Sequence, residues 1–340
     1  MTNASFYQDK EVLVTGGCGS IGSEIVRQLI GLGARIVKVF DNDEEGHFNL
    51  QHDLPSEKIR HLIGDVRSKQ RLDFAMKNVD IIFHAAALKH VPLCEYNPFE
   101  ALQTNVIGTQ NALDSAREHN VKHFVFISTD KAVNPINTMG ATKLLGEKLT
   151  LTADLGPTVT KFACVRFGNV LGSSGSVIPI FKRQIQKGGP VTLTSPHMTR
   201  FCMSLSEAVS LILRVPPIMQ GKEIFILKMK ALKVKDLADV LIEELAPKHG
   251  HASSSIVLKE IGIRPGEKLH ESLMVADELP YLKILDDMFV VQSKSNVPHF
   301  TEAVEEHHHG LAQGSFSSQH TLHLTKDEIR ELLRKENLLN

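Results

Sequence analysis

Short apolar runs and segments with helical spacing alternate along the first half of the chain. The apolar runs predict β-strands at residues 11–17, 35–41, 58–65, 79–87, 121–129 and 161–172. The segments with apolar residues three and four positions apart predict helices at residues 23–33, 67–78, 97–120 and 139–155. Strands that alternate with helices indicate an α/β fold, with a parallel sheet covered by helices on both faces.

The alternation ends near Gly172. Residues 173–181 and 188–200 are rich in Gly, Ser and Pro, and they predict loops and short elements. Residues 205–215 and 223–228 are apolar again and predict a return to the first lobe. The second half of the chain is therefore expected to be interleaved with the first.

This interleaving sets the predicted domains. The first domain comprises residues 1–172, with 201–228 returning to it, and the second lobe comprises residues 173–200 and 229–340. The smaller lobe is expected over the carboxyl ends of the strands, where ligands bind in such sheets. The tail at 325–337 predicts a charged amphipathic helix with Thr325 as its N-cap.

Composition narrows the class of protein. The 340 residues are 42% hydrophobic and 23% charged, with a net charge of −1, so neither nucleic acid nor a membrane surface is an expected partner. The polar start and the lack of a run of about 18 apolar residues predict a cytoplasmic protein without a signal peptide or membrane span. The four dispersed cysteines predict reduced thiols. His307–His309 predicts a surface loop rather than a metal site.

A glycine-rich turn follows the first predicted strand and opens the first predicted helix. Its glycines are spaced three apart. Glycine permits a tight turn and a close approach of the backbone to a pyrophosphate, which the helix N-terminus then faces. A purely structural turn is the alternative, but this setting favours a dinucleotide site in a Rossmann-type, doubly wound sheet. The cofactor-binding residues expected here are Thr15, Gly16, Gly19, Ser20, Ile21 and Gly22.

Asp41 ends the second predicted strand, about twenty residues after the glycines. A carboxylate at this position accepts hydrogen bonds from the ribose hydroxyls of NAD and repels the extra phosphate of NADP. No arginine follows Asp41 closely, so NAD is predicted, with NADP as the less favoured alternative. A solvated acid in "DNDEE" is the other interpretation of Asp41.

The stretch "STDKAVNPINTMGATK", residues 128–143, carries the most specific chemistry. A short-chain dehydrogenase would carry Tyr four residues before the final Lys, but Met139 stands there, and a thioether cannot transfer a proton. Asp130 and Lys131 offer an acid and an amine base directly after a buried strand. A surface ion pair is the alternative interpretation of these two neighbours.

Together with "HAAALKHVPLCEYNPFEALQTNVIGTQN", "VRFGNVLGSSGSVIPIF" and "MTRF", this stretch resembles the UDP-N-acetylglucosamine 4,6-dehydratase family. That family is in the polysaccharide-biosynthesis branch of the extended short-chain dehydrogenases, and the resemblance covers roughly residues 10–290. It implies NAD-dependent conversion of a UDP-N-acetylhexosamine to a 4-keto-6-deoxy sugar. Oxidation at C4 acidifies the C5 proton, the C6 hydroxyl leaves as water, and the hydride returns to C6. A homo-oligomer is also expected.

The resemblance implies roles for residues in and near the TDK stretch, Thr129 to Lys131. Asp130 would be the acid at C6, and Lys131 the base at C5. A working Lys131 base requires a lowered pKa, through burial or a neighbouring cation such as Lys143. Lys143 would also hold the nicotinamide ribose, and Thr129 or Ser128 the C4 oxygen. Without Tyr, the C4 proton would leave through Lys131, Thr129 or a water.

The remaining binding residues follow by the same resemblance. The further cofactor residues are Asp65, Val66, Ala85 and Ala86. The expected substrate-binding residues are Lys89 and His90, which would face the sugar, and Asn169, Arg200 and Arg264, which would hold the diphosphate. A solvated or structural charge is the alternative for each Lys and Arg among them.

Two other functions compete with dehydration. A nucleotide-sugar 4-epimerase needs the cofactor and C4 oxidation, but it does not need the acid–base pair of Asp130 and Lys131. A non-catalytic NAD-binding sensor that lost its tyrosine needs neither that pair nor the anion-binding elements. The stereochemistry at C5 is open, because Met139 resembles anchored family members that retain configuration, while the tail resembles soluble members that invert it. The tail and the lack of an anchor favour inversion.

Overall fold

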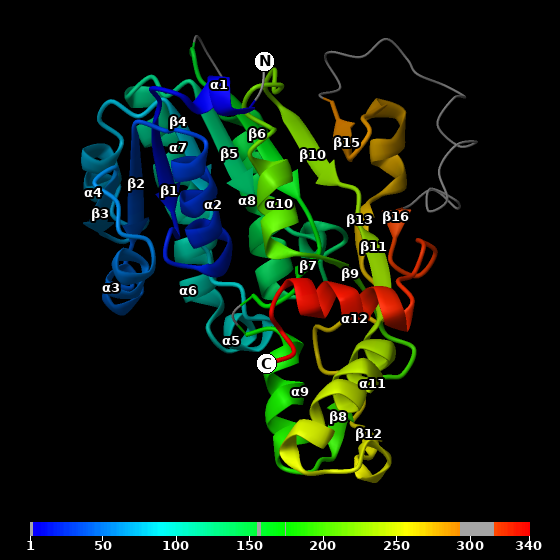
Figure 1. Ribbon diagram of the computed structural model, residues 1–340. Helices are drawn as coiled ribbons and strands as arrows, with labels where there is room; N and C mark the ends of the chain where they lie inside the picture. The colour runs from blue at the N-terminus through cyan, green and yellow to red at the C-terminus, as the bar shows by residue number, and fades with distance from the viewer. Residues whose placement is uncertain (1–2, 155–157, 174, 293–315) are drawn as a thin grey trace.

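The larger lobe is built on a nine-stranded sheet in the order β14-β15-β10-β6-β5-β4-β1-β2-β3 (Figure 1). The computed structural model describes residues 3–154, 158–173, 175–292 and 316–340. The strands are β1 (Glu11–Thr15), β2 (Ile36–Asp41), β3 (Ile59–Ile63), β4 (Ile81–His84), β5 (His123–Ile127), β6 (Lys161–Arg166), β10 (Glu223–Leu227), β14 (Leu282–Ile284) and β15 (Met288–Val291).

The direction in which successive strands are added to the sheet reverses between β1 and β4: β2 and β3 follow on one side of β1, and β4, β5 and β6 on the other. The strands β3, β2, β1, β4, β5, β6 and β10 pair in parallel, whereas β15 runs antiparallel to both β10 and β14. Every residue of β1 and β4 is buried, as expected for Val- and Ile-rich strands covered on both faces. The predicted doubly wound α/β fold is confirmed, and its switch point is where such sheets bind ligands.

Helices cover both faces of this sheet. On one face α2 packs against α10, and on the other α7 packs against α4 and α8 (Figure 1). Between α6 and α7 the backbone forms one π-helical turn at Gln103–Ile107, so the predicted helix over 97–120 is not uniform. The helices of this lobe are α1 (Asn3–Tyr7), α2 (Ser20–Gly31), α3 (Glu44–Asp53), α4 (Lys69–Ala75), α5 (Val91–Tyr96), α6 (Pro98–Leu102), α7 (Gly108–Glu118), α8 (Thr138–Thr152) and α10 (Leu205–Ile212).

The smaller lobe has an apolar core of its own, between α9 (Val177–Gln186), α11 (Val234–Leu245) and α12 (Lys326–Lys335). Its strands are β8 (Val191–Leu193) with β12 (Leu258–Glu260), the sheet of β7 (Asn169–Val170), β9 (Thr199–Met203) and β11 (Lys230–Lys233), and the pair β13 (Ser272–Met274) with β16 (Phe316–Ser317). Thr325 caps α12 through a reciprocal pair of hydrogen bonds with Glu328, which confirms the predicted tail helix.

Two local predictions about this lobe were wrong. The strand predicted over 161–172 leaves the main sheet after Arg166, and Asn169–Val170 pairs with β9 instead. Residues 173–181 were predicted as loops and short elements, but α9 begins at Val177. A proline in a first helical turn sacrifices no helical hydrogen bond, so Pro179 does not prevent the helix, and its buried face is apolar.

The assignment of all residues 229–340 to the second lobe was also wrong in part. The segments Leu282–Ile284 and Met288–Val291 form the antiparallel edge of the main sheet. The run "MFVV" is wholly buried there and contributes to the main core. The triple histidine His307–His309 lies outside the described residues. All four cysteines are free thiols.

Candidate active site

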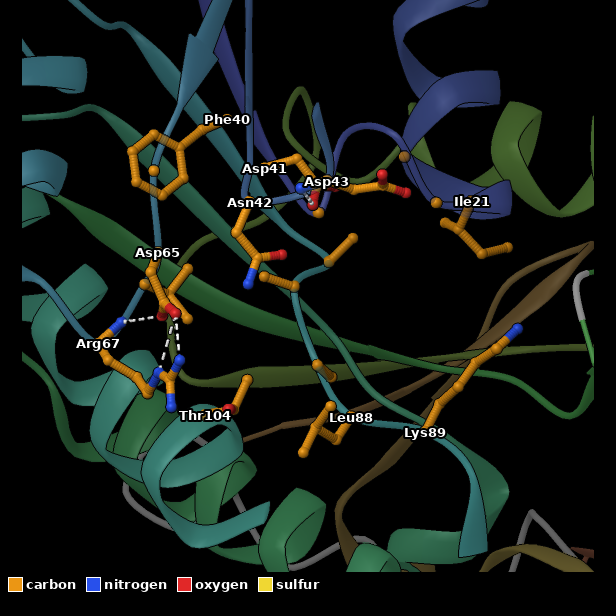
Figure 2. A pocket seen from close by; sticks show the side chains of 18 of the residues that line it. Ile21, Phe40, Asp41, Asn42, Asp43, Asp65, Arg67, Leu88, Lys89 and Thr104 are labelled. Carbon is orange, nitrogen blue, oxygen red and sulfur yellow. Dashed lines mark hydrogen bonds and ion pairs between the residues drawn. The ribbon is translucent and has the colours of Figure 1, made fainter. Parts of the chain in front are cut away.

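A cleft crosses the carboxyl ends of the strands around the switch point. It consists of two adjoining cavities of about 480 Å³ and about 380 Å³, which share Ile21, Ala85 and residues 87–90 as lining. The first cavity contains the glycine turn and the ends of β2 and β3 (Figure 2). The second contains residues from the end of β5, from α8 and from 167–176. Both sizes are typical of cofactor and substrate sites.

The glycine turn has the close backbone approach that a dinucleotide requires. Gly16 has a φ of +66°, and a Cβ added there would lie 2.6 Å from the backbone nitrogen of Ala86. A Cβ at Gly22 would lie 2.1 Å from the carbonyl oxygen of Gly16. Gly19 is the N-cap of α2 and offers no side-chain cap, so the first amides of α2 are available to an anion. The turn therefore fits a pyrophosphate.

Acidic side chains border the far end of the first cavity. Asp41 accepts hydrogen bonds from the backbone amides of Cys18 at 3.0 Å and Asp43 at 3.2 Å, which fix its carboxylate beside the cavity. Asp65 accepts from the Nε of Arg67 at 2.9 Å, and this bonding lowers the pKa of Asp65 (Figure 2). Arg67 also lines this cavity, and sequence reasoning did not identify it. Its guanidinium is already paired with two carboxylates, because it donates to Glu100 at 2.9 Å as well as to Asp65.

Every predicted cofactor residue lines one of the two cavities except Thr15. Thr15 is buried below the turn, where its Oγ1 lies 2.8 Å from Nδ1 of His84. Nε2 of His84 lies 3.1 Å from Oγ1 of Thr109. Burial, together with the nearby Lys143, lowers the pKa of His84 to about 3. His84 is therefore a neutral structural group, and Thr15 also accepts a hydrogen bond at 3.4 Å from the backbone amide of Ala86, which lines the first cavity.

Asp130 and Lys131 lie directly after β5, in a single turn of 3₁₀-helix. Asp130 is fully buried, and its Oδ1 accepts hydrogen bonds from Nζ of Lys131 and from Oγ1 of Thr129, both at 2.9 Å. Oδ2 of Asp130 has no hydrogen-bond partner among the described residues. Thr129 and Lys131 line the second cavity. Asp130 itself lines neither cavity, so the amine of Lys131 lies at the cavity wall with the carboxylate of Asp130 directly behind it.

The pKa of Lys131 is raised in the structure, whereas a role as base requires a lowered one. Burial alone would lower it, but the carboxylates of Asp130 and Glu271 more than offset burial and raise the pKa above its usual value. Glu271 contributes because its Oε1 lies 3.9 Å from Nζ of Lys131. Lys131 is therefore an ammonium group in the structure as it stands, and any role as a base requires a place for its proton.

Lys143 is a buried lysine that lines the second cavity. Its Nζ donates to the carbonyl oxygen of Ile127 at 2.5 Å and lies 4.0 Å from the centre of the Phe126 ring. Burial lowers the pKa of Lys143 to about 8, although Glu147 one turn along α8 opposes the shift. The hydroxyl of Ser128 donates to Glu147 at 2.6 Å. The hydroxyl of Ser128 is thus engaged by Glu147, and that of Thr129 by Asp130.

The predicted substrate residues fall into two groups. Lys89, His90 and Asn169 line the second cavity, and the ring of His90 fills the space beside the α-carbon of Gly175. Arg200 and Arg264 line neither cavity.

The two arginines have other surroundings. The guanidinium of Arg200 donates to the carbonyl oxygens of Thr199, Lys268 and Leu269, so it fastens β9 to the segment before β13. Arg264 is exposed in its loop. The prediction that both arginines hold the diphosphate is therefore not supported by their positions.

Two buried groups that order the site were missed. Asn105, in the π-helical turn, donates to and accepts from the backbone of Leu88 and donates to Thr142, so it fixes the loop between the cavities to α8. Arg166 forms paired hydrogen bonds with Glu147 on one side and Glu278 on the other. No short sequence motif predicts either group, because Asn105 depends on a π-helical turn and Arg166 bonds Glu278, which lies 112 residues further along the chain.

Comparison with known proteins supplies independent findings. The family model described as "Polysaccharide biosynthesis protein" matches residues 12–293. An uncharacterised membrane protein of Methanocaldococcus jannaschii is 58% identical over 85% of this chain and 87% of its own length. The inverting UDP-N-acetylglucosamine 4,6-dehydratase of Campylobacter jejuni is 42% identical over 80% of this chain and 79% of its own. The UDP-glucose 4-epimerase of Rickettsia conorii is 36% identical over 96% of both chains.

Solved structures agree with these relatives. Pen from Bacillus thuringiensis matches with a TM-score of 0.90 and 40% identity, over 98% of this chain and all of its own. The dTDP-glucose 4,6-dehydratase DesIV from Streptomyces venezuelae, solved with NAD bound, matches with a TM-score of 0.68 and 25% identity, over 76% of this chain and 86% of its own. Although one relative is named a membrane protein, no helix within the described ranges is long and apolar enough to cross a bilayer.

Proposed function

The chain belongs to the polysaccharide biosynthesis protein family, whose relatives include sugar-nucleotide dehydratases and epimerases, and we propose that it is an NAD-dependent UDP-N-acetylhexosamine 4,6-dehydratase. The substrate would be UDP-N-acetylglucosamine and the product a 4-keto-6-deoxy sugar, in polysaccharide or glycan biosynthesis. The observation that carries the proposal is Lys131 at the wall of the second cavity, hydrogen-bonded to the buried carboxylate of Asp130 behind it. Elimination needs such an acid–base pair, and epimerisation at C4 does not.

The first cavity would hold the adenosine and pyrophosphate of the dinucleotide, and the nicotinamide end would extend into the second cavity. The glycine turn would take the pyrophosphate, Asp41 the adenosine ribose, and Lys143 the nicotinamide ribose. When bound, NAD would supply the redox chemistry at C4 and C6. The close backbone approach at Gly16, which leaves no room for a side chain, and the fixed carboxylate of Asp41 support this assignment.

The second cavity would hold the sugar against the TDK turn, which is Thr129 together with the 3₁₀ turn at Asp130–Ala132. Thr129 would hydrogen-bond the C4 oxygen, and Lys131 as a neutral amine would remove the C5 proton. Asp130, once protonated, would donate to the leaving C6 hydroxyl, and its unpartnered Oδ2 gives it a free oxygen for a proton. Met139 takes no part in proton transfer. The C4 hydroxyl loses its proton on oxidation, and this proton would pass through the hydroxyl of Thr129 to Asp130, to which Thr129 donates at 2.9 Å, so that Asp130 gains the proton that it later gives to the C6 hydroxyl.

Incubation of the purified protein with UDP-N-acetylglucosamine tests this function. The expected product is a 4-keto-6-deoxy sugar nucleotide, identified by NMR. The Rickettsia relative favours a 4-epimerase as the second candidate, which would instead yield the C4 epimer with its C6 hydroxyl intact. Either product identifies the reaction, and recovery of unchanged substrate would reject both.

Mass spectrometry of the nucleotide released from the purified protein should find NAD. The reaction cycle is redox-neutral, so the cofactor should remain bound through purification. Asp41 would disfavour a 2′-phosphate, and Arg67 is already paired with Asp65 and Glu100. A preparation that contained mainly NADP would contradict the role assigned to Asp41.

Substitution of Met139 by leucine should be mild. Its side chain is buried among Val91, Cys94 and Ala101, and a volume-conserving swap in such a cluster usually costs less than about 1.5 kcal/mol. The rate of product formation should therefore stay within a few-fold of wild type, with a similar melting temperature. A loss of about 10²-fold at unchanged melting temperature would show that the thioether takes part in the chemistry.

We also propose that the reaction inverts C5. The name of the Campylobacter relative specifies inversion, and the loss of the C5 proton leaves a planar centre that can be reprotonated from either face. Lys89, which lines both cavities, is a candidate second proton donor. The coupling between H4 and H5 after reduction of the product reports the configuration. A D-configured 6-deoxy sugar as the sole product would reject inversion and leave dehydration intact.

A further inference from the structure

Glu271 is a buried carboxylate that faces the TDK turn from the opposite lobe. It directly precedes β13, and only 3% of its surface is exposed. The segment after β16 holds its backbone in place, because the amide of Glu271 donates to Oγ of Ser318 at 2.9 Å and the amide of Ser318 donates to the Glu271 carbonyl at 2.8 Å. These two hydrogen bonds therefore hold the backbone from which the Glu271 side chain extends toward Asp130 and Lys131.

The carboxylate of Glu271 lies between two ammonium groups without a hydrogen bond to either. Its Oε1 is 3.9 Å from Nζ of Lys131, and its Oε2 is 3.9 Å from Nζ of Lys268. Nζ of Lys268 already donates to the carbonyl oxygen of Val133 at 2.6 Å. Oε2 has no hydrogen-bond partner among the described residues, which is costly for a buried carboxylate.

The charges around Glu271 come from three segments. Asp130 and Lys131 face it from the 3₁₀ turn, Arg200 from β9, and Lys268 from its own segment. Burial, and next the negative charge of Asp130, raise the pKa of Glu271, and the three cations oppose that shift. Glu271 is thus a carboxyl group that takes up a proton more readily than an exposed glutamate.

We propose that Glu271 is a positioning residue that stores the proton of Lys131 during catalysis. In this step an N–H bond of Lys131 breaks and an O–H bond forms at Oε1 of Glu271, so both side chains become neutral and the net charge of the pair is unchanged. The neutral amine then accepts the C5 proton of the sugar. This inference rests on the proposed dehydratase function, because it supplies the free amine that elimination needs.

The geometry requires only a small movement. The distance from Oε1 to Nζ must shorten by about 1 Å to reach a charge-assisted hydrogen bond. Rotation of the lysine side chain away from Asp130 achieves this, and it also frees Asp130 for the C6 hydroxyl. The same movement gives the buried carboxylate of Glu271 a hydrogen bond at Oε1, while Oε2 stays 3.9 Å from Nζ of Lys268.

The pH profile of elimination distinguishes proton storage from a purely structural role. Within the wild-type pair, the neutral form holds as many protons as the charged form, so its population does not depend on pH. In Glu271→Gln the lysine must release its proton to water, and the neutral amine then becomes tenfold more abundant with each pH unit below its pKa. We expect a flat kcat between about pH 6 and pH 9 for wild type, but a rise with a slope near one for Glu271→Gln.

The rates and controls follow from the same argument. At neutral pH, kcat of Glu271→Gln should be about 10²-fold below wild type, with little change in KM for UDP-N-acetylglucosamine. Glu271→Asp keeps a carboxylate and should keep the flat profile even if its rate is lower. Glu223→Gln is the matched control, because Glu223 is also buried, accepts two backbone amides and lies at the opposite end of the sheet from the cleft.

The outcomes are separable. A flat profile with wild-type kcat in Glu271→Gln overturns the inference and leaves the dehydratase function standing. A higher kcat in Glu271→Gln also overturns it, because removal of a carboxylate that merely held Lys131 charged would free the amine. An inactive wild type overturns the proposed function, and this inference with it. Retention of bound NAD and an unchanged melting temperature in the variants exclude misfolding as the cause of a changed profile.

Discussion

Substitution of Lys131 by alanine should abolish water loss while NAD remains bound. Lys131 contacts the second cavity and not the first, so its removal leaves the glycine turn and Asp41 intact. Loss of a general base commonly lowers a rate by about 10²–10⁴-fold, and Lys131 is the amine that the proposed mechanism assigns to the C5 proton. The measurement is the rate of 4-keto-6-deoxy product formation, together with the NAD content of the purified variant.

A companion variant and a control complete the experiment. Asp130→Asn should slow elimination by about 10²–10⁴-fold, because an amide cannot donate the proton that the C6 hydroxyl needs. Lys228→Ala removes a partly buried lysine that lines neither cavity of the cleft, and it should leave the rate near wild type. Retained activity in Lys131→Ala would show that the roles of the TDK turn are wrongly assigned.

Substitution of Arg166 by methionine should have the largest effect on stability. Arg166 and Glu147 are 3% and 1% exposed, with paired hydrogen bonds at 2.8 and 3.0 Å, and Arg166 also bonds Glu278. Removal of one partner leaves buried carboxylates without their cation, which typically costs about 3–5 kcal/mol. Denaturant unfolding should show this loss of free energy of unfolding.

The control for Arg166 is an exposed ion pair of similar geometry. Lys230 and Glu328 are 49% and 41% exposed and lie 2.8 Å apart, so Lys230→Met should cost less than about 1 kcal/mol. The Arg166 variant should also bind NAD less tightly, because Glu147 organises both Ser128 and the neighbourhood of Lys143. Equal losses in the two variants would mean that the buried network does not order the site.

The parts of the site that lie on one local stretch were predictable from the sequence. The glycine turn depends on residues within one strand–turn–helix unit, so spacing alone located it. Asp130 and Lys131 directly follow β5, and the end of a buried parallel strand is where such a sheet exposes functional side chains. The hydrophobic alternation likewise predicted the central strands, because each is short, apolar and separated from the next by a helix.

The parts that depend on distant contacts were not predictable. Glu271 follows Lys131 by 140 residues, and its charge adds to that of Asp130 in raising the pKa of Lys131. Arg200 was expected at the diphosphate, but the carbonyl oxygens of Lys268 and Leu269 engage its guanidinium. The edge strand Met288–Val291 lay in a region with no alternating pattern, and only its antiparallel pairing with β10 identifies its lobe.

The most direct test of the central claim is the reaction of wild-type protein with UDP-N-acetylglucosamine in heavy water, followed by NMR of the product. If Lys131 and Asp130 act on C5 and C6, the product is a 4-keto-6-deoxy sugar that carries deuterium at C5, because the proton removed there exchanges with solvent before its return. A C4 epimer with its C6 hydroxyl intact and no deuterium at C5 would contradict the account, because it would mean that the acid–base pair does not act on the sugar.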